Sequence, residues 1–126
     1  MEDKKMAEKN YQIQDGVDVS EHVLATIAGL AAAEVEGVAV LNGGLTSNMI
    51  AKAPKSRLAK AVRVINNEDN TLTVQAIIVV KYGYTIIDVS TQVQEKVKNA
   101  IENMTELTVR SVDVKVSNVS VPNRAE

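Results

Sequence analysis

Histidine and cysteine, the side chains that most often hold metals or carry out catalysis, are almost absent from this chain. Its 126 residues include one histidine and no cysteine. His22 alone cannot form a histidine-based metal cluster, and without cysteine there is no thiol nucleophile, thiolate metal site or disulfide. Ser20 lies two residues before His22, but side chains at that spacing on a helix do not face each other. We therefore expect no catalytic pair, no metal site and no cofactor.

Two other features fail to predict chemistry. Glu34 is the only acid within an apolar helical sector, where burial would raise its pKa, and we expect a hydrogen-bonded structural role at the edge of the core. The loop Asn42-Gly43-Gly44 matches neither GxxxxGK[ST] nor GxGxxG, so it is not a phosphate-binding loop. The GxxG loop of RNA-binding KH domains is also missing. The sequence therefore predicts a protein that is not an enzyme.

Positive charge is concentrated in one part of the chain. Residues 37–67 contain five bases and no acid. These bases are Lys52, Lys55, Arg57, Lys60 and Arg63. The stretch is either a solvated loop or a binding segment for phosphate, anionic lipid or an acidic protein surface. The whole chain has a pI of about 5.5, which argues against a dedicated nucleic-acid binder.

The three tyrosines are the only aromatic residues. Tyr84 follows a predicted strand, where it forms either a structural junction or an exposed anchor for a partner. Residues 76–80 form the longest strongly apolar run, which is far too short to cross a bilayer. We therefore expect no membrane span, and we expect the chain to be cytoplasmic.

Hydrophobic spacing predicts elements in the order β-α-β-β-β-α-β. Their expected ranges are 11–14, 20–36, 38–41, 62–65, 72–82, 88–104 and 109–121. Two helices on one mostly antiparallel sheet form a two-layer α+β fold. It spans residues 11–121 as a single domain, between a disordered tail at 1–10 and a second tail at 122–126. Residues 45–60 are expected to form a loop, with a helical turn near 48–51.

Three details of the strands and of the second helix are also predicted. Ile77 and Val79 lie on the second face of an apolar strand, whose middle is therefore expected to be buried on both sides. Val119 and Val121 are out of phase with the preceding valines, which predicts a bulge or bend near Ser117-Asn118. Asp88 or Ser90 is expected to cap the second helix.

The first helix has an unusual back face. At about 100° per residue, its larger apolar side chains share one side, which we predict to face the core. The opposite side is small and nearly uncharged, and it holds Ala25, Gly29, Ala32 and Ala33. This face either packs inside the domain or receives a partner whose backbone can come close.

Taken together, these segments resemble the alkaline-shock, envelope-stress-response family of Gram-positive bacteria. The matching stretches are VLATIAGLAAAEVEGVAVLNGG at 23–44, VVKYGYTIIDVSTQVQEKVKNAIENMTEL at 79–107 and VDVKVSNVSV at 112–121. The likeness covers about residues 11–121, and AAAEVEGV and QEKVKNAIENMT are its most specific parts. Glu106 stands where we would expect glycine, at the end of the second helix.

The resemblance implies a non-enzymatic adaptor that binds other proteins, self-associates and is held at the membrane by a partner. We name Ala25, Gly29, Ala32, Ala33, Lys52, Lys55, Arg57 and Tyr84 as candidate interaction residues. One branch of the family implies an alternative, a regulator that binds a biosynthetic enzyme such as acetyl-CoA carboxylase. A nucleic-acid-binding α+β module is the third hypothesis.

Overall fold

The computed structural model describes residues 10–122. Its elements are β1 (Asn10–Gln14), β2 (Val17–Ser20), α1 (Glu21–Ala33), β3 (Val38–Leu41), α2 (Ser47–Ile50), α3 (Lys55–Leu58), β4 (Val62–Asn66), β5 (Leu72–Lys81), α4 (Ile86–Thr105) and β6 (Val109–Ser120). The tails predicted at 1–10 and 122–126 lie outside the described residues, apart from Asn10, which begins β1, and Pro122.

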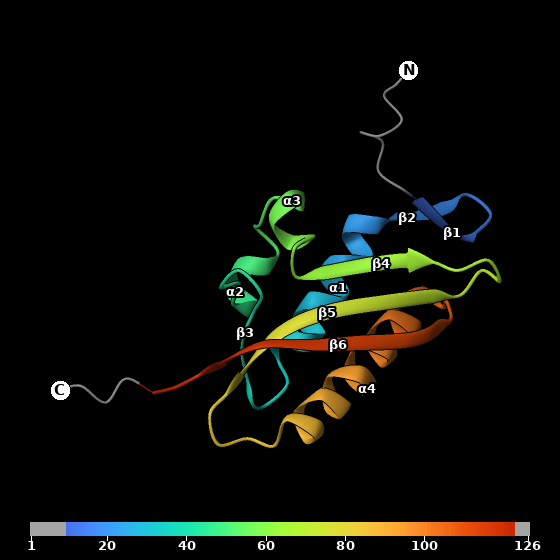
Figure 1. The fold of residues 1–126 in the computed structure, drawn as a ribbon. Helices are drawn as coiled ribbons and strands as arrows, with labels where there is room; N and C mark the ends of the chain where they lie inside the picture. The colour runs from blue at the N-terminus through green and yellow to red at the C-terminus, as the bar shows by residue number, and fades with distance from the viewer. Residues whose placement is uncertain (1–9, 123–126) are drawn as a thin grey trace.

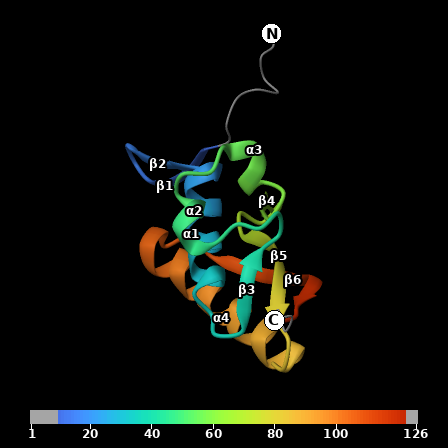
Figure 2. The ribbon, with the colours of Figure 1, turned by 90° about the vertical axis from the view of Figure 1, so that its left-hand side faces the viewer.

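β5 is the central strand of the main sheet (Figure 1). β4 pairs antiparallel with its first half and β3 with its second half, while β6 runs parallel along the other edge. β1 and β2 form a separate antiparallel pair. α1 and α4 pack against each other on one face of the main sheet (Figure 2). The predicted two-layer α+β fold with a mostly antiparallel sheet is confirmed.

The core lies between this sheet and the two long helices. Alternate side chains of β5, from Leu72 to Val80, are buried beneath the helices. Ile77 and Val79 point to the other face and are only half-buried. The expectation that both faces of β5 are buried was wrong, because no helix of the described residues covers the second face (Figure 1).

The bulge predicted in the last strand is confirmed. Ile78 pairs with Val116, but the next residue, Val79, pairs with Asn118, so Ser117 is the extra residue of β6. One extra residue inverts the alternation of side chains in the rest of β6, so residues that would have faced away from the helices now face them. Val119 therefore pairs with the buried Val80 on the core side of the sheet.

The helices differ from the prediction at three places, of which the first is α1, which ends at Ala33 instead of residue 36. α2 occupies the helical turn expected near residues 48–51, but α3 was not predicted. Pro54 is the N-cap of α3, and its φ of −62° suits the start of a helix. The N-cap of α4 is Thr85, and the helix begins at Ile86. The predicted cap at Asp88 or Ser90 was therefore wrong, and Asp88 lies in the first turn.

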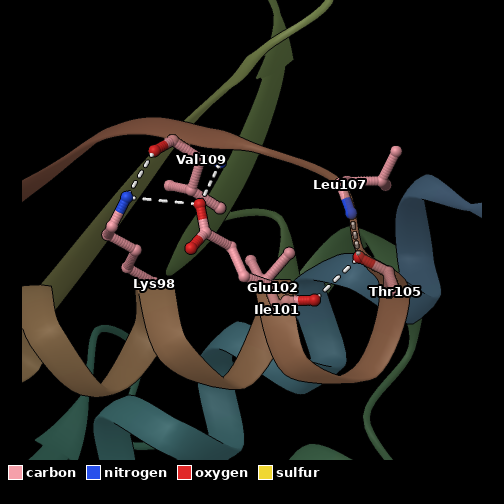
Figure 3. Close-up of polar contacts among 6 residues, drawn as sticks. All are labelled: Lys98, Ile101, Glu102, Thr105, Leu107 and Val109. Carbon is pink, nitrogen blue, oxygen red and sulfur yellow. Dashed lines mark hydrogen bonds and ion pairs between the residues drawn. The ribbon is translucent and has the colours of Figure 1, made fainter.

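β6 is an edge strand, and side chains of α4 cover its first part (Figure 3). Lys98 Nζ donates to the Val109 carbonyl at 3.2 Å, and the Val109 N–H donates to Glu102 Oε2 at 2.8 Å. Gln94 Nε2 donates to the Val112 carbonyl at 3.0 Å. Because these helix residues are spaced four apart, they project from one face of α4. They bind backbone groups of β6 that pair with no other strand within residues 10–122. These groups are therefore not available for pairing with a strand of another chain.

Candidate interaction surfaces

The residues considered for chemistry do not form a site. His22 is half-buried in the first turn of α1. Glu34 is the C-cap of α1 and is exposed, so the expected place at the edge of the core was wrong. Within residues 10–122, no group of three or more His, Cys, Asp or Glu side chains is placed to hold a metal ion.

The small face of α1 is not an open surface. Ala25, Gly29 and Ala32 are buried, and Ala33 is half-buried against the core. A Cβ atom added to Gly29 would lie 3.4 Å from Ile50 Cγ2 and 3.6 Å from Leu58 Cδ1. The small face, which we considered as a partner-binding surface, is therefore covered by other parts of the same domain.

The rotation of α1 explains this correction. Helices α2 and α3 pack on the small face, so the helix turns its small residues inward and some of its larger ones outward. Val23, which we placed on the core side, is 43% exposed, and Ile27 is half-buried. The wheel identified the two faces, and Leu24 of the larger face is buried as predicted. It did not anticipate that α2 and α3 would cover the small face.

The basic segment, residues 52–63, lies mainly on the surface around α2 and α3. Lys52 follows α2, and Lys55 and Arg57 belong to α3; all three are exposed. Arg57 Nη2 donates to the Gly43 carbonyl at 3.0 Å, and Asn42 Nδ2 donates to the Lys60 carbonyl at 2.9 Å. These bonds tie the segment to the loop after β3, so its charges are held on an ordered part of the surface.

An exposed apolar surface, which we call the apolar end, gathers where β5 leads into α4. It consists of Tyr82, Tyr84, Ile86, Ile87, Val119 and Val121. The Tyr82 N–H donates to the Ser120 carbonyl at 2.9 Å, which joins the turn after β5 to the end of β6. Both views place these segments at one end of the molecule (Figures 1 and 2).

Two side chains dominate this surface. Ile87 is 72% exposed and Tyr82 is 68% exposed. Large apolar side chains gathered on a surface mark protein-binding sites more often than scattered ones do. Of these residues, only Tyr84 was named from the sequence as a candidate interaction residue. The tyrosines and isoleucines of YGYTII at 82–87 are the signal that would have identified Tyr82, Ile86 and Ile87.

Tyr84 has a structural role as well as an exposed one. Its hydroxyl donates to Glu36 Oε2 at 3.4 Å, and its ring lies beside Gly37. A Cβ atom at Gly37 would lie 2.6 Å from Val89 Cγ2 and 2.9 Å from the Tyr84 ring, so this close approach requires glycine. The φ of Gly37 is +100°, which also favours glycine.

A cavity of about 210 Å³ opens between the first half of α1 and α3. Ala25, Leu58, Ala59 and Val62 supply its apolar lining. Glu21, His22 and Lys55 supply its polar lining. No pattern in the sequence pointed to this cavity, because α3 was not predicted.

Comparison with known proteins places this fold in a family. A family model described as having a "cell envelope-related function" matches residues 9–121. The chain belongs to this cell envelope-related family. The envelope-related resemblance found in the sequence is thereby confirmed.

Relatives in two bacteria cover most of the chain. "Uncharacterized protein Spy1614" of Streptococcus pyogenes is 33% identical over 86% of this chain and 91% of its own length. "Uncharacterized protein YqhY" of Bacillus subtilis is 29% identical over 87% of this chain and 81% of its own length. "Uncharacterized protein YloU" of the same organism is 31% identical over 85% of this chain and 90% of its own length.

Solved structures of MamM CTD variants share a partial likeness of shape. One has a TM-score of 0.46 and 16% identity, over 76% of this chain and 92% of its own length. In the described part of this member of the envelope-related family, no helix is both long and apolar enough to cross a membrane.

Proposed function

We propose that this chain is a non-enzymatic adaptor that binds proteins in the envelope stress response of Gram-positive bacteria, including the response to alkaline conditions. Membership of a family with a cell envelope-related function supports the cellular context. The single observation that carries the binding role is the apolar end, where Ile87 and Tyr82 are largely exposed. We also propose that the chain self-associates and is held at the membrane by a partner protein.

The test disrupts the apolar end at Ile87, whose exposed side chain contributes little to folding. Ile87→Asp places a charge on a side chain that is 72% exposed. Asn99→Asp adds the same charge at an exposed position further along α4 and is the matched control. Both proteins are expected to fold with the thermal stability of the wild type.

The readout is complementation in a strain that lacks this protein. The wild type and Asn99→Asp should restore growth after an alkaline shift, whereas Ile87→Asp should not. Proteins cross-linked to the wild type, but absent with Ile87→Asp, identify the partner. Full restoration by Ile87→Asp would refute a role for the apolar end.

A second candidate is a regulator of a biosynthetic enzyme such as acetyl-CoA carboxylase. The observation that favours it is the exposed basic segment with Lys52 and Arg57. Reversing both charges to glutamate should abolish binding to purified acetyl-CoA carboxylase in a surface-binding assay, while Ile87→Asp should not. Equal binding by the charge-reversed and wild-type proteins would remove this candidate.

A further inference from the structure

The cavity between α1 and α3 has the size and lining of a site for one apolar side chain. Its volume is about 210 Å³, and Leu58 and Val62 contribute to its apolar wall. An apolar protein cavity of about 150 Å³ accepts benzene, so this one accommodates a side chain the size of leucine, methionine or phenylalanine. Because the cavity is open between two helices, the backbone that carries the side chain can stay outside.

Charge around the cavity is unequal on its two sides. On the α1 side, the lining includes the acid Glu21. On the α3 side it includes Lys55, and the exposed Lys52 and Lys60 belong to the same acid-free stretch of chain. Opposite charge steers association and fixes register. The α3 side therefore favours an acidic ligand.

The length of the basic segment distinguishes a peptide from a small molecule. A small carboxylate would fill the cavity without reaching the bases outside it. The bases, however, continue from residue 52 to residue 63, beyond the residues that line the cavity. A segment of several acidic residues uses both the cavity and the charges outside it.

We propose that the cavity and the basic segment together bind a short acidic segment of a partner protein, which inserts one apolar side chain between α1 and α3. This inference rests on the proposed protein-binding function but concerns a different surface. The cavity adjoins α3, whereas the apolar end lies at the turn into α4, at the opposite end of the molecule (Figure 1). A chain with two separate binding ends joins two proteins.

The test uses synthetic peptides and the full-length protein labelled with ¹⁵N. Glu-Glu-Leu-Glu-Glu is the probe, and Glu-Glu-Ser-Glu-Glu and Lys-Lys-Leu-Lys-Lys are its controls. The leucine peptide should shift backbone amide signals of residues 21–25 and 55–62. The serine peptide cannot bury an apolar side chain in the cavity, so it should bind at least about tenfold more weakly. The lysine peptide should not bind.

A matched pair of variants separates the cavity from general surface effects. Ala59→Trp fills the cavity from an exposed position at the end of α3 and should weaken binding of the leucine peptide about tenfold. Ala51→Trp makes the same change at an exposed residue that does not line the cavity, and it should leave binding unchanged. Equal binding by the two variants, or by the leucine and serine peptides, overturns the proposal.

One further arm tests whether the chain fills its own cavity. Met6→Ser is made in the full-length chain without peptide; residue 6 lies outside the described residues. If this change shifts the same cavity amides, the occupant is the chain's own N-terminal segment and the proposal is overturned. If peptide binding fails while Ile87→Asp still abolishes complementation, the inference fails alone and the proposed function stands.

Discussion

At the scale of single residues, Glu106 occupies the left-handed position that ends α4. Its φ is 64°, and its N–H donates to the Glu102 carbonyl at 2.9 Å. The Thr105 hydroxyl donates to the Ile101 carbonyl at 2.7 Å and accepts from the Leu107 N–H at 3.1 Å (Figure 3). The helix therefore ends at the position where the resemblance led us to expect glycine, and hydrogen bonds hold the turn although glutamate is strained there.

Replacing Glu106 by glycine should stabilise the protein. The left-handed conformation costs a residue with a Cβ atom about 1–2 kcal/mol, and glycine would remove this strain. Part of the gain in stability is lost because glycine is more flexible in the unfolded chain. We expect Glu106→Gly to raise the free energy of unfolding by about 1 kcal/mol in urea titrations. Glu106→Ala keeps the Cβ atom and should gain much less; an equal gain would show that strain is not the cause.

Tyr11 carries a buried hydroxyl that has no hydrogen-bond partner within the described residues. Burial, and secondarily the charge of Glu21, raise its pKa. An unsatisfied buried hydroxyl costs about 1–3 kcal/mol, so Tyr11→Phe should raise the free energy of unfolding by about 1 kcal/mol. Thermal unfolding checks this, with Tyr82→Phe as the exposed control. A loss of stability in Tyr11→Phe would mean that the hydroxyl is bonded in solution.

At the scale of elements, α1 is held by packing on its small face. A Cβ atom added to Gly29 would contact Leu41, Ile50 and Leu58, which come from β3, α2 and α3. Alanine brings its Cβ atom only to ordinary contact distance there, whereas a longer side chain must displace its neighbours or bury a charge.

Gly29→Glu should therefore abolish folding, measured by circular dichroism, because its carboxylate would be buried among apolar side chains. Gly29→Ala should leave the free energy of unfolding within about 1 kcal/mol of the wild type, because alanine's higher helix propensity offsets the tighter fit. A well-folded Gly29→Glu protein would restore the discarded idea that this face is open to a partner.

The covered edge of β6 makes stability depend on pH. The Val109 N–H and, more weakly, Lys98 lower the pKa of Glu102. The folded state therefore binds the Glu102 proton less tightly than the unfolded state does. The stabilisation is present above the unfolded pKa of about 4.3 and is lost as pH falls through the lower folded pKa.

Glu102→Ala should lower the free energy of unfolding by about 1 kcal/mol at neutral pH, because it leaves the Val109 N–H without its acceptor. The charge-dependent part of that difference should shrink below about pH 4, as measured by urea unfolding across pH. Glu95→Ala, an exposed change on the same helix, should show neither effect. A pH-independent loss would assign the effect to packing.

At the scale of the whole molecule, the two candidate surfaces lie at opposite ends. The basic segment and the cavity adjoin α3, and the apolar end adjoins the start of α4 (Figure 1). This arrangement fits a protein that links others, and it makes the apolar end the better candidate for self-association, because like charges oppose contact between two basic segments.

Light scattering across concentration should show a wild-type mass that rises above 13.6 kDa, the mass of one chain. Ile87→Asp should remain at the monomer mass over the same range, because the charge would be desolvated in the contact. Asn99→Asp should behave as the wild type. A monomeric wild type at every concentration would rule out self-association through this end.

Elements with a strong residue pattern could be predicted from the amino-acid sequence alone. Periodicity indicated the apolar stripe of α4, the buried side of β5 and the bulge at Ser117, because each depends on the spacing of neighbours along the chain. A family resemblance then indicated the envelope-related context.

Which surfaces are covered could not be predicted from the sequence, because it depends on how the elements pack together. Periodicity showed that α1 has a small face and a larger apolar face, but α2 and α3, short helices without a long repeating pattern, decided that the small face is buried. The same packing creates the cavity beside Ala25. Burial depends on contacts between distant segments, and these are not contained in the spacing of residues along one helix.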